Sequence, residues 1–376
     1  MRLLHTSDWH LGKSLRGQPL LEDQKFIIDE IFHVIDDEKP DAIIIAGDIY
    51  DRAVPPAEAV DVFDETLARL AEKNLPTLII AGNHDSATRL NFGSRIFADK
   101  KIFIASKVAM EPATVVLQDD FGEIYFSLIP FFDTADIREK FSVEKADGFN
   151  FSDANKIYIE AARQKIPAGK RSVAVAHAFI SGAEKTDSVR EIVGCAEGIG
   201  AEIFSDYNYV ALGHIHSSHG AGKNLRYSGS PLKYSFDEAN HKKGVTIVEI
   251  DGAGDVTTKK IKLTPRHDVR IVKGNVYELQ KLPRTEDYIC AQLTERTVNA
   301  ADKLGNVFPN LLKVEFILNE NFSDDAENKI SRQKGGSTLD YFADFFKEQT
   351  GETLSDEYGA AMKNLFAKLA RDEREA

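Results

Sequence analysis

Four short motifs of aspartate, asparagine and histidine contain the residues of this chain that could bind metal ions. They are Asp8-Trp9-His10, Gly47-Asp48-Ile49-Tyr50-Asp51, Gly82-Asn83-His84-Asp85 and Gly213-His214-Ile215-His216, and His177 stands alone between the third and the fourth. Carboxylate, amide oxygen and imidazole together suit borderline divalent ions such as Mn²⁺, Fe²⁺ or Zn²⁺. One such residue alone is more often structural, but the four motifs in this order predict a metal site.

Asp48 is the residue that could join two ions in one site. A carboxylate has two oxygens and can hold one cation with each, which suits the roughly 3.5–4 Å between the ions of two-metal phosphoesterase sites. The apolar run Ile43-Ile44-Ile45 comes just before it, so Asp48 is expected where a buried strand gives way to a loop. Gly47, Gly82 and Gly213 each precede a candidate ligand, where a residue without a Cβ atom lets the loop turn sharply and crowd the ions.

Predicted strands alternate with amphipathic helices in the part of the chain that contains the first three motifs. Each of these motifs follows a strand, and apolar residues at helical spacing lie between the motifs. This order indicates a parallel or mixed sheet with its chemistry at the carboxyl ends of the strands. The strands are predicted over 2–7, 42–46 and 77–81, and the helices over 24–38 and after Pro55-Pro56.

Later apolar runs predict further strands. One ends at His177 and another at Gly213, so the remaining candidate ligands also follow strands. Runs at 225–228, 245–250 and 259–263 could close a second sheet.

The composition changes near Pro265 and divides the chain into predicted parts. Residues 1–264 contain all the candidate ligands, and 265–318 predict a small α+β domain without a ligand cluster of its own. The polar stretch 319–336 ends in two glycines and is predicted to be a linker. Residues 337–376 contain two patterns typical of helix starts, each followed by an apolar stripe, and are predicted to be helical.

The bulk composition excludes several classes of protein. Of 376 residues, 43% are hydrophobic and 28% are charged, as in an ordinary soluble protein of two domains. Cys195 and Cys290 form no CxxC pair, so neither a disulfide framework nor a cysteine zinc site is indicated. The first residues contain no apolar signal region, and no run of apolar residues is long enough to span a membrane, so we expect a cytoplasmic protein. The net charge of −13 argues against a protein that coats nucleic acid, although metal ions could supply positive charge in a nuclease.

The motif series resembles that of the calcineurin-like metallophosphoesterase superfamily over about residues 1–216. A narrower resemblance is to the SbcD family of bacterial nuclease subunits, related to the double-strand-break nucleases of archaea and eukaryotes. It rests on the position of the first motif, on Tyr227-Ser228-Gly229-Ser230-Pro231-Leu232 and on Val307-Phe308-Pro309-Asn310-Leu311-Leu312. The resemblance implies an α/β fold, a four-layer α-β-β-α sandwich over residues 1–264, with 265–318 as a small α+β domain that caps the DNA.

The same resemblance implies a role for each candidate residue. One ion, for which we expect Mn²⁺, would be held by Asp8, His10, Asp48 and His216, and a second by Asp48, Asn83, His177 and His214. His84 would give a proton to the leaving oxygen or contact the transition state. The alternative is that His84 has no catalytic role and either supports a ligand or faces solvent. Asp51 stands where the archaeal and eukaryotic relatives have histidine. In the phosphatase branch this carboxylate orients the histidine of the GNH motif, so we expect Asp51 to hold His84 in its productive tautomer.

The implied activity is that of a DNA nuclease, a duplex exonuclease and a single-strand or hairpin endonuclease, which processes DNA ends near the nucleoid. The implied partners are DNA and an SMC-like ATPase of the SbcC type, which would bind residues 337–376. A second copy of this chain would pair with the first through residues 60–70 and 89–97, so that two copies of each subunit form a heterotetramer. The stripes of 337–376 could instead pack on the chain itself. Other open alternatives are hydrolysis of cyclic nucleotides, phosphoproteins or small phosphoesters, and a non-catalytic scaffold. Ala53 and Asp85 argue against the phosphoprotein branch, which has glycine and glutamate there.

Overall fold

The computed structural model describes residues 1–143, 148–182, 198–317, 342–343, 346–347, 353–355 and 358–363. Its contacts divide the chain into two compact units. The first contains Met1–Leu293 and Thr297–Glu315, and the second contains Thr294–Arg296 and Phe316–Ala376. All four ligand motifs lie in the first unit.

A six-stranded sheet carries the first three motifs. Its strands lie in the order β14 (Val256–Lys262), β13 (Gly244–Ile250), β1 (Arg2–Thr6), β4 (Ala42–Ala46), β5 (Thr77–Ile80) and β6 (Ile102–Ala105). The last four are parallel to one another. Their carboxyl ends therefore meet at one edge of the sheet, where the loops with Asp8, Asp48 and Asn83 begin.

A second six-stranded sheet carries the remaining ligands. Its strands lie in the order β11 (His219–Gly220), β12 (Leu225–Tyr227), β10 (Tyr209–Gly213), β9 (Arg171–His177), β8 (Gly122–Ile129) and β7 (Ala113–Asp119). β12, β10, β9 and β8 are parallel, with Gly213 opposite His177 at the ends of β10 and β9. His177 and His214 are therefore delivered to the same edge.

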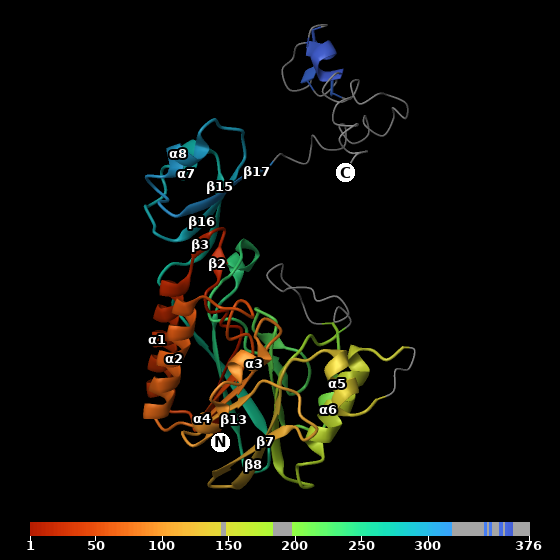
Figure 1. Ribbon diagram of the computed structural model, residues 1–376. Helices are drawn as coiled ribbons and strands as arrows, with labels where there is room; N and C mark the ends of the chain where they lie inside the picture. Colours follow the sequence, from red (N-terminus) through yellow and green to blue (C-terminus); the bar gives the residue numbers. More distant parts are fainter. Residues whose placement is uncertain are drawn as a thin grey trace. The chain divides into compact units, whose positions relative to one another are not determined.

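The two sheets lie face to face between two layers of helices (Figure 1). Helices α1 (Leu21–Glu38) and α2 (Ala57–Glu72) share one hydrophobic cluster with the outer face of the first sheet. Helices α5 (Thr134–Lys140) and α6 (Phe151–Arg163) share another with the outer face of the second. A third cluster joins the inner faces, among them Leu3 and Ile44 of one sheet and Phe126 and Val175 of the other. The predicted α-β-β-α sandwich is confirmed.

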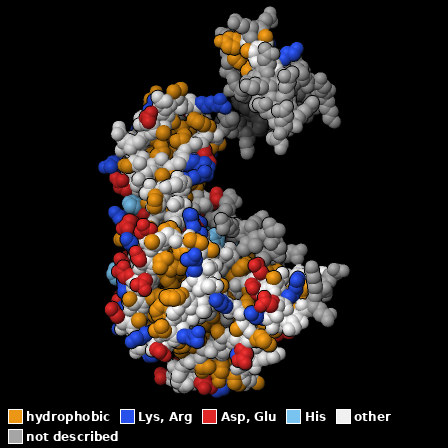
Figure 2. Space-filling model, viewed as in Figure 1, with side chains coloured by type: hydrophobic (Ala, Val, Ile, Leu, Met, Phe, Trp, Pro, Cys, Tyr) orange, Lys and Arg blue, Asp and Glu red, His pale blue; other side chains and the backbone are white. Residues whose placement is uncertain are grey.

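The apolar spacing explains why α1 forms and where it ends. Ile27, Ile31 and Ile35 lie one turn apart and are buried against the sheet. Lys39 then takes a left-handed φ of +46°, and Pro40 follows, so the helix cannot continue. Figure 2 shows acidic side chains gathered over α1 and α2, so part of the net charge of −13 lies on this helical layer.

Shorter elements complete the core of the first unit. A hairpin of β2 and β3 follows the first motif, and α3 and α4 follow the third. Their bounds, with those of two 3₁₀ helices, are β2 (Ser14–Leu15), β3 (Gln18–Pro19), α3 (Ala87–Leu90), α4 (Ser94–Ala98), η1 (Ala201–Phe204) and η2 (Phe236–Asn240).

The prediction that the runs at 245–250 and 259–263 close the second sheet is wrong. The first run is β13, which pairs antiparallel with β1, and the second lies in β14, which pairs with β13. Both strands therefore extend the first sheet. Without β13, the buried strand β1 would leave one row of backbone groups unpaired, which is costly in a core.

A three-stranded sheet follows Pro265. It is made of β15 (Val269–Gly274), β16 (Tyr288–Leu293) and β17 (Leu311–Phe316), with α7 (Val276–Leu279) and α8 (Ala300–Leu304). It has a hydrophobic cluster of its own, which includes Ile289, Leu304 and Phe308. Helix α7 was not predicted from the sequence, although Asn275 and Glu278 form a capping box at its start. The predicted boundary at residue 265 stays a prediction.

The predicted linker 319–336 lies outside the described residues. Of 337–376 the structure describes short pieces, and those at 342–343, 346–347 and 358–363 are helical. Among the helices that the structure describes, none is long and apolar enough to cross a membrane.

Candidate metal centre

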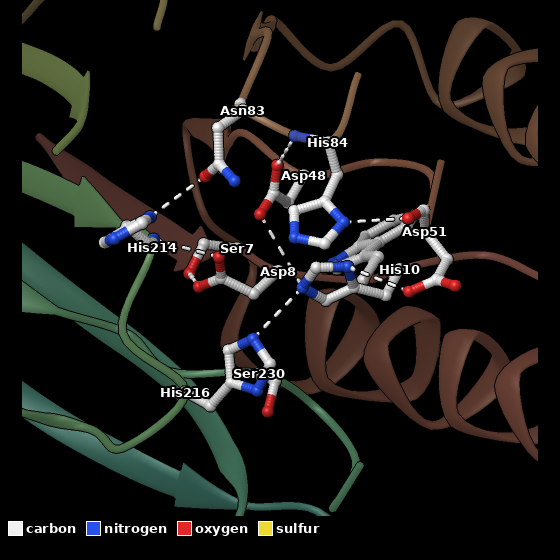
Figure 3. Close-up of polar contacts among 12 residues, drawn as sticks. Ser7, Asp8, His10, Asp48, Asp51, Asn83, His84, His214, His216 and Ser230 are labelled. Carbon is white, nitrogen blue, oxygen red and sulfur yellow. Dashed lines mark hydrogen bonds and ion pairs between the residues drawn. The ribbon is translucent and has the colours of Figure 1, made fainter. Parts of the chain in front are cut away.

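The loops at the carboxyl ends of five strands bring the candidate ligands to one place. Figure 3 shows the side chains that follow β1, β4, β5 and β10 pointing toward one another. His177, at the end of β9, joins them through contacts with Asn83 and Asp48. Six of the gathered side chains are buried, namely Asp8, His10, Asp48, His84, His177 and His216. The structure therefore brings together all seven predicted ligands and His84.

Asp8, His10, Asp48 and His216 form what we call the first cluster. Nε2 of His10 lies 3.0 Å from Nε2 of His216 and 3.6 Å from Oδ2 of Asp48. A carboxylate oxygen of Asp8 and one ring nitrogen each of His10 and His216 all lie within 4.8 Å of one another. Bonds of about 2.0–2.2 Å from nitrogen and oxygen let one ion reach donors at such separations.

Asp48, Asn83, His177 and His214 form the second cluster. Oδ1 of Asn83 lies 3.0 Å from Nε2 of His177 and 2.9 Å from Nδ1 of His214. Oδ2 of Asp48 lies 3.4 Å from Nε2 of His177. Asp48 thus borders both clusters, which is the position that a bridging carboxylate needs.

Hydrogen bonds fix which nitrogen of two histidines faces the centre. Nδ1 of His177 lies 2.9 Å from the carbonyl oxygen of Ala46, and Nδ1 of His216 lies 3.0 Å from Oε1 of Glu238. A carbonyl or carboxylate oxygen accepts, so Nδ1 donates in both rings and Nε2 is turned to the centre. This is the arrangement in which metal-binding histidines are usually held.

The buried charges of the centre call for cations. Burial would raise the pKa of Asp48, but His177, His10 and His84 hold it well below its usual range. Burial would likewise lower the pKa of His177, but the carboxylates of Asp48 and Asp8 raise it to about 9. Burial lowers the pKa of His10 well below its usual range. The carboxylates of the centre therefore need positive charge beside them.

The facing rings of His10 and His216 test whether a metal fits. Two ring nitrogens 3.0 Å apart need a proton or a metal cation between them, because their lone pairs otherwise repel. The mixed imidazole, carboxylate and amide donors suit borderline divalent ions. The residues present therefore fit divalent metal ions.

Comparison with known families agrees with this chemistry. The family model described as calcineurin-like phosphoesterase matches residues 1–218. The chain belongs to the calcineurin-like phosphoesterase family. The match spans every motif from Asp8 to His216, and family and donors together assign divalent metal ions to the centre.

Within this family, two relatives that are named as SbcD, a subunit of the nuclease SbcCD, align with nearly the whole chain. The protein of Staphylococcus epidermidis is 28% identical over 376 residues, which are 98% of this chain and 98% of that protein. The protein of Staphylococcus saprophyticus is 30% identical over 386 residues, 99% of each. The similarity to these nuclease subunits therefore continues past residue 218 and through the three-stranded sheet.

The three glycines before the ligands are sterically required. A Cβ atom on Gly47 would lie 2.3 Å from Nδ1 of His177, and one on Gly82 would lie 2.2 Å from Oδ1 of Asp48. A Cβ atom on Gly213 would lie 1.9 Å from a backbone oxygen of β4. The predicted crowding is confirmed at all three positions, and Gly47 also has the left-handed φ of +87° that a sharp turn needs.

Four of the proposed ligands themselves have left-handed backbone angles. Such angles cost of order 1–3 kcal/mol for residues other than glycine and persist where the surrounding structure imposes them. They turn each side chain back toward the centre directly after its strand ends. The residues are Asp8 (φ +55°), His10 (φ +46°), Asp48 (φ +51°) and His214 (φ +100°).

Glu238 and Lys243 are residues of this site that were not predicted from the sequence. Glu238 is fully buried, accepts from His216 through Oε1 and forms an ion pair with Lys243 through Oε2. Nζ of Lys243 also donates to the backbone oxygen of His216 (2.8 Å) and to Oγ of Ser230 (2.7 Å). Burial would raise the pKa of Glu238, but Lys243 and His216 lower it, so the carboxylate stays charged behind the ring. Glu238 lies in η2 and Lys243 directly before β13, and neither belongs to a recognisable motif.

The prediction that the Asp51 carboxylate orients His84 is wrong. Nδ1 of His84 lies 2.7 Å from the backbone carbonyl oxygen of Asp51, so the main chain sets the tautomer. The Asp51 carboxylate lies 2.6 Å from Nζ of Lys13, because the ammonium group attracts it away. The backbone N–H of His84 donates to Oδ1 of Asp48 (2.8 Å), which ties the ring to the centre (Figure 3).

Asp85 joins two of the ligand loops and was also missed. Its carboxylate accepts from the backbone N–H groups of Ile49 (3.1 Å), Tyr50 (2.9 Å) and Gly82 (2.9 Å). Burial and the neighbouring Asp48 raise its pKa to about 7, against these three hydrogen bonds. The carboxylate thereby holds the loop after β4 against the loop after β5.

Proposed function

We propose that this phosphoesterase is a two-metal DNA nuclease subunit of an SbcCD-type complex that processes DNA ends. The observation that carries the proposal is the pair of ligand clusters that share Asp48, with His84 beside both. The choice of DNA is supported by two relatives that are named as nuclease subunits and align along almost the full chain. Duplex exonuclease and hairpin or single-strand endonuclease activity, in the cytoplasm near the nucleoid, belong to the same proposal.

The first cluster would hold one ion and the second cluster the other, with Mn²⁺ as the ion we propose. Two divalent ions so bound would neutralise charge on the scissile phosphate and lower the pKa of a water molecule. The chain would orient two of the histidine ligands, His216 and His177, through hydrogen bonds from their Nδ1 atoms. Glu238 does this for His216, and the backbone of β4 does it for His177.

His84 is proposed to donate a proton to the leaving oxygen. Its Nδ1 donates to the carbonyl oxygen of Asp51, so a second proton on the ring would sit on Nε2. The ring packs edge to face on that of His10, with centroids 4.6 Å apart, which restricts its rotation. A ring held in this way can give the Nε2 proton to the departing oxygen as the bond to phosphorus breaks.

A second copy of the chain is the proposed partner at α3 and α4. Phe92 and Ile96 expose 85% and 73% of their surface, which supports an apolar contact there. Leu67 and Leu70 of α2 are buried in the chain's own core, and Val60 is the large hydrophobic residue of the proposed α2 contact that stays exposed.

An SMC-like ATPase is the proposed partner of residues 337–376. The relatives' name places them in a complex with another subunit, and the apolar stripes of this segment support a docking role. Deleting 337–376 should abolish co-purification of the ATPase subunit while Mn²⁺-dependent hydrolysis of a small diester survives. Undiminished co-purification would show that the ATPase binds elsewhere.

The nuclease proposal is tested with the purified full-length chain. We expect Mn²⁺-dependent cleavage of linear DNA, with the His84→Gln variant as the matched control for contaminating nucleases. Parallel assays use a cyclic nucleotide, a phosphopeptide and a small phosphomonoester. Turnover of one of these substrates, together with intact DNA in the presence of the ATPase subunit, would overturn the choice of DNA and retain the phosphoesterase family.

A further inference from the structure

A cavity lies beside the three-stranded sheet, and its lining includes Lys243, which also contacts the backbone of His216. It has a volume of about 490 Å³ and is lined by the loop 231–233, by residues 239–243 and by the connection from β14 to β15. Tyr288 of β16 also lines it, whereas none of the seven proposed metal ligands does. Cavities of roughly 300–1,000 Å³ are the size that small organic ligands occupy.

The acidic side chains of this cavity already have partners. Asp23 lies 2.8 Å from Nδ1 of His267 and accepts from the hydroxyl of Tyr288 at 2.8 Å. Asp268 forms an ion pair with Lys233, 2.8 Å away. The third, Asp287, pairs with Arg270. Each of these three carboxylates therefore has a hydrogen-bond or ion-pair partner.

Several cationic or proton-donating side chains of the same lining are uncompensated. Lys242 and Lys262 are exposed and form no ion pair or side-chain hydrogen bond with any residue that the structure describes. Nδ1 of His241 is buried and has no hydrogen-bond partner in the described part of the chain. Crowded positive charge is evident at the neighbouring Lys260, whose pKa is lowered to about 8 by burial and by Lys243, Arg226 and Lys242. In a chain of net charge −13 this local excess of positive charge indicates an anionic ligand.

The other part of the lining is apolar. Ala239 and Pro265 are half-buried and contribute hydrocarbon surface beside the cationic residues, whereas Leu232, Leu263 and Val269 of the lining are almost fully buried. A ligand that satisfies both parts has one anionic group and one apolar body. Lysine ammonium groups bind phosphate as point charges, and a neutral imidazole can donate one hydrogen bond to a phosphate oxygen.

We propose that this cavity binds a phosphate monoester with a flat apolar body, of the size of a nucleoside monophosphate. Lys242 and Lys262 contact the phosphate, and the apolar part of the lining contacts the base. The same chemistry is offered by a free mononucleotide and by the phosphorylated end of a DNA strand. None of the seven proposed metal ligands lines the cavity, so the proposal does not depend on the proposed nuclease function.

The test uses the full-length chain in EDTA, which removes metal-dependent phosphate binding at the catalytic centre. Calorimetric titration with dAMP should give one site per chain. Deoxyadenosine, which lacks the phosphate, should bind at least about tenfold more weakly, as expected for loss of charged hydrogen bonds. A 5′-phosphorylated oligonucleotide that displaces dAMP identifies a strand end as the source, and one that does not identifies the free nucleotide.

The matched variants separate this cavity from general charge effects. Lys242→Glu/Lys262→Glu should weaken dAMP binding at least about tenfold, whereas Lys223→Glu, an exposed lysine outside the cavity, should leave it unchanged. Equal Kd for dAMP in the double variant and the wild type, both with unchanged thermal unfolding, would overturn the proposal. So would the absence of dAMP binding to the wild-type chain.

Discussion

The two ligand clusters on either side of Asp48 are oriented by different means. In the first cluster, His216 is held by the carboxylate of Glu238, which is itself paired with the buried Lys243. In the second cluster, His177 is held by the backbone carbonyl of Ala46 in β4. One histidine therefore depends on two charged side chains, from η2 and from the start of β13, and the other depends on the position of a strand.

This difference predicts which kind of substitution disrupts each cluster. A side-chain substitution can remove the support of His216, because Glu238 has no backbone substitute. The support of His177 cannot be removed by a side-chain truncation and is lost when the backbone of β4 moves. Five substitutions test this comparison, and they follow in order of decreasing expected effect.

Replacing the residue common to both clusters should affect both. Asp48→Ala removes the carboxylate that borders both clusters and the acceptor of the His84 N–H. We expect loss of both metal ions and a fall in phosphodiester hydrolysis on the order of 10³-fold or more, since charge stabilisation at the reacting phosphate is lost. Metal analysis after gel filtration checks the first part. Retention of one ion per chain would show that Asp48 serves a single cluster.

Replacing His84 should separate chemistry from metal binding. His84→Gln keeps a side chain of similar length but cannot act as a proton donor of suitable pKa. We expect the metal content of the wild type and a fall in kcat of about 10²–10⁴-fold, the usual contribution of general acid catalysis. Full activity in this variant would remove His84 from the mechanism, and loss of metal would make it a ligand.

Replacing Glu238 should weaken the first cluster alone. Glu238→Gln removes the charged acceptor behind His216, and such supporting partners are worth about 10–100-fold in metal affinity. It also leaves the buried Lys243 unpaired, at a cost of about 3–5 kcal/mol in the free energy of unfolding. Calorimetry with Mn²⁺ should show one weakened site and one unchanged site.

A paired variant serves as the control for this loss of stability. Glu238→Gln/Lys243→Met removes both charges, so urea unfolding should recover most of the lost stability while the weak Mn²⁺ site stays weak. If the double variant recovered both the stability and the Mn²⁺ affinity, Glu238 would affect metal binding through the stability of the fold and not through its hydrogen bond with His216.

A glycine is the corresponding weak point of the second cluster. A Cβ atom at Gly213 would lie 1.9 Å from the carbonyl oxygen of Ala46 and 2.8 Å from Nδ1 of His177. Gly213→Ala should therefore displace the acceptor of His177, weaken the second ion and lower the free energy of unfolding by about 1–3 kcal/mol, as overpacking does. Calorimetry with Mn²⁺ should show weaker binding at the second site and unchanged affinity at the first site. Equal weakening of both sites would contradict the separate supports.

The smallest effect is expected at Asp51. Because its backbone carbonyl and not its carboxylate contacts His84, Asp51→Asn leaves that hydrogen bond in place. We expect kcat within about threefold of the wild type, far below the 10²–10⁴-fold of general acid catalysis. Lys13→Ala, which breaks the same ion pair from the other side, is the control. A large loss in Asp51→Asn alone would restore a role for the carboxylate.

The alternation of strands and helices and the candidate ligands were visible in the sequence because both are local patterns, whereas the four-layer sandwich was implied by the family resemblance. A ligand that follows an apolar strand, such as Asp48 or His177, is visible from the order of residues alone. The pairing of β13 with β1 was not visible, because it joins the two ends of the domain and strand runs do not specify their partners. Glu238 was missed for the same reason, since its importance lies in a contact with His216 across the fold. The atom by which Asp51 holds His84 depends on Lys13, which no motif connects to it.

The central claim is that Asp48 lies between two metal ions, one in each cluster. Anomalous diffraction from crystals grown with Mn²⁺ tests it most directly. The account predicts two peaks separated by about 3.5–4 Å, the spacing of two-metal sites, with an oxygen of Asp48 on each. The first peak should lie among Asp8, His10 and His216, and the second among Asn83, His177 and His214. A single peak, or two peaks of which one has no contact with Asp48, would contradict the claim.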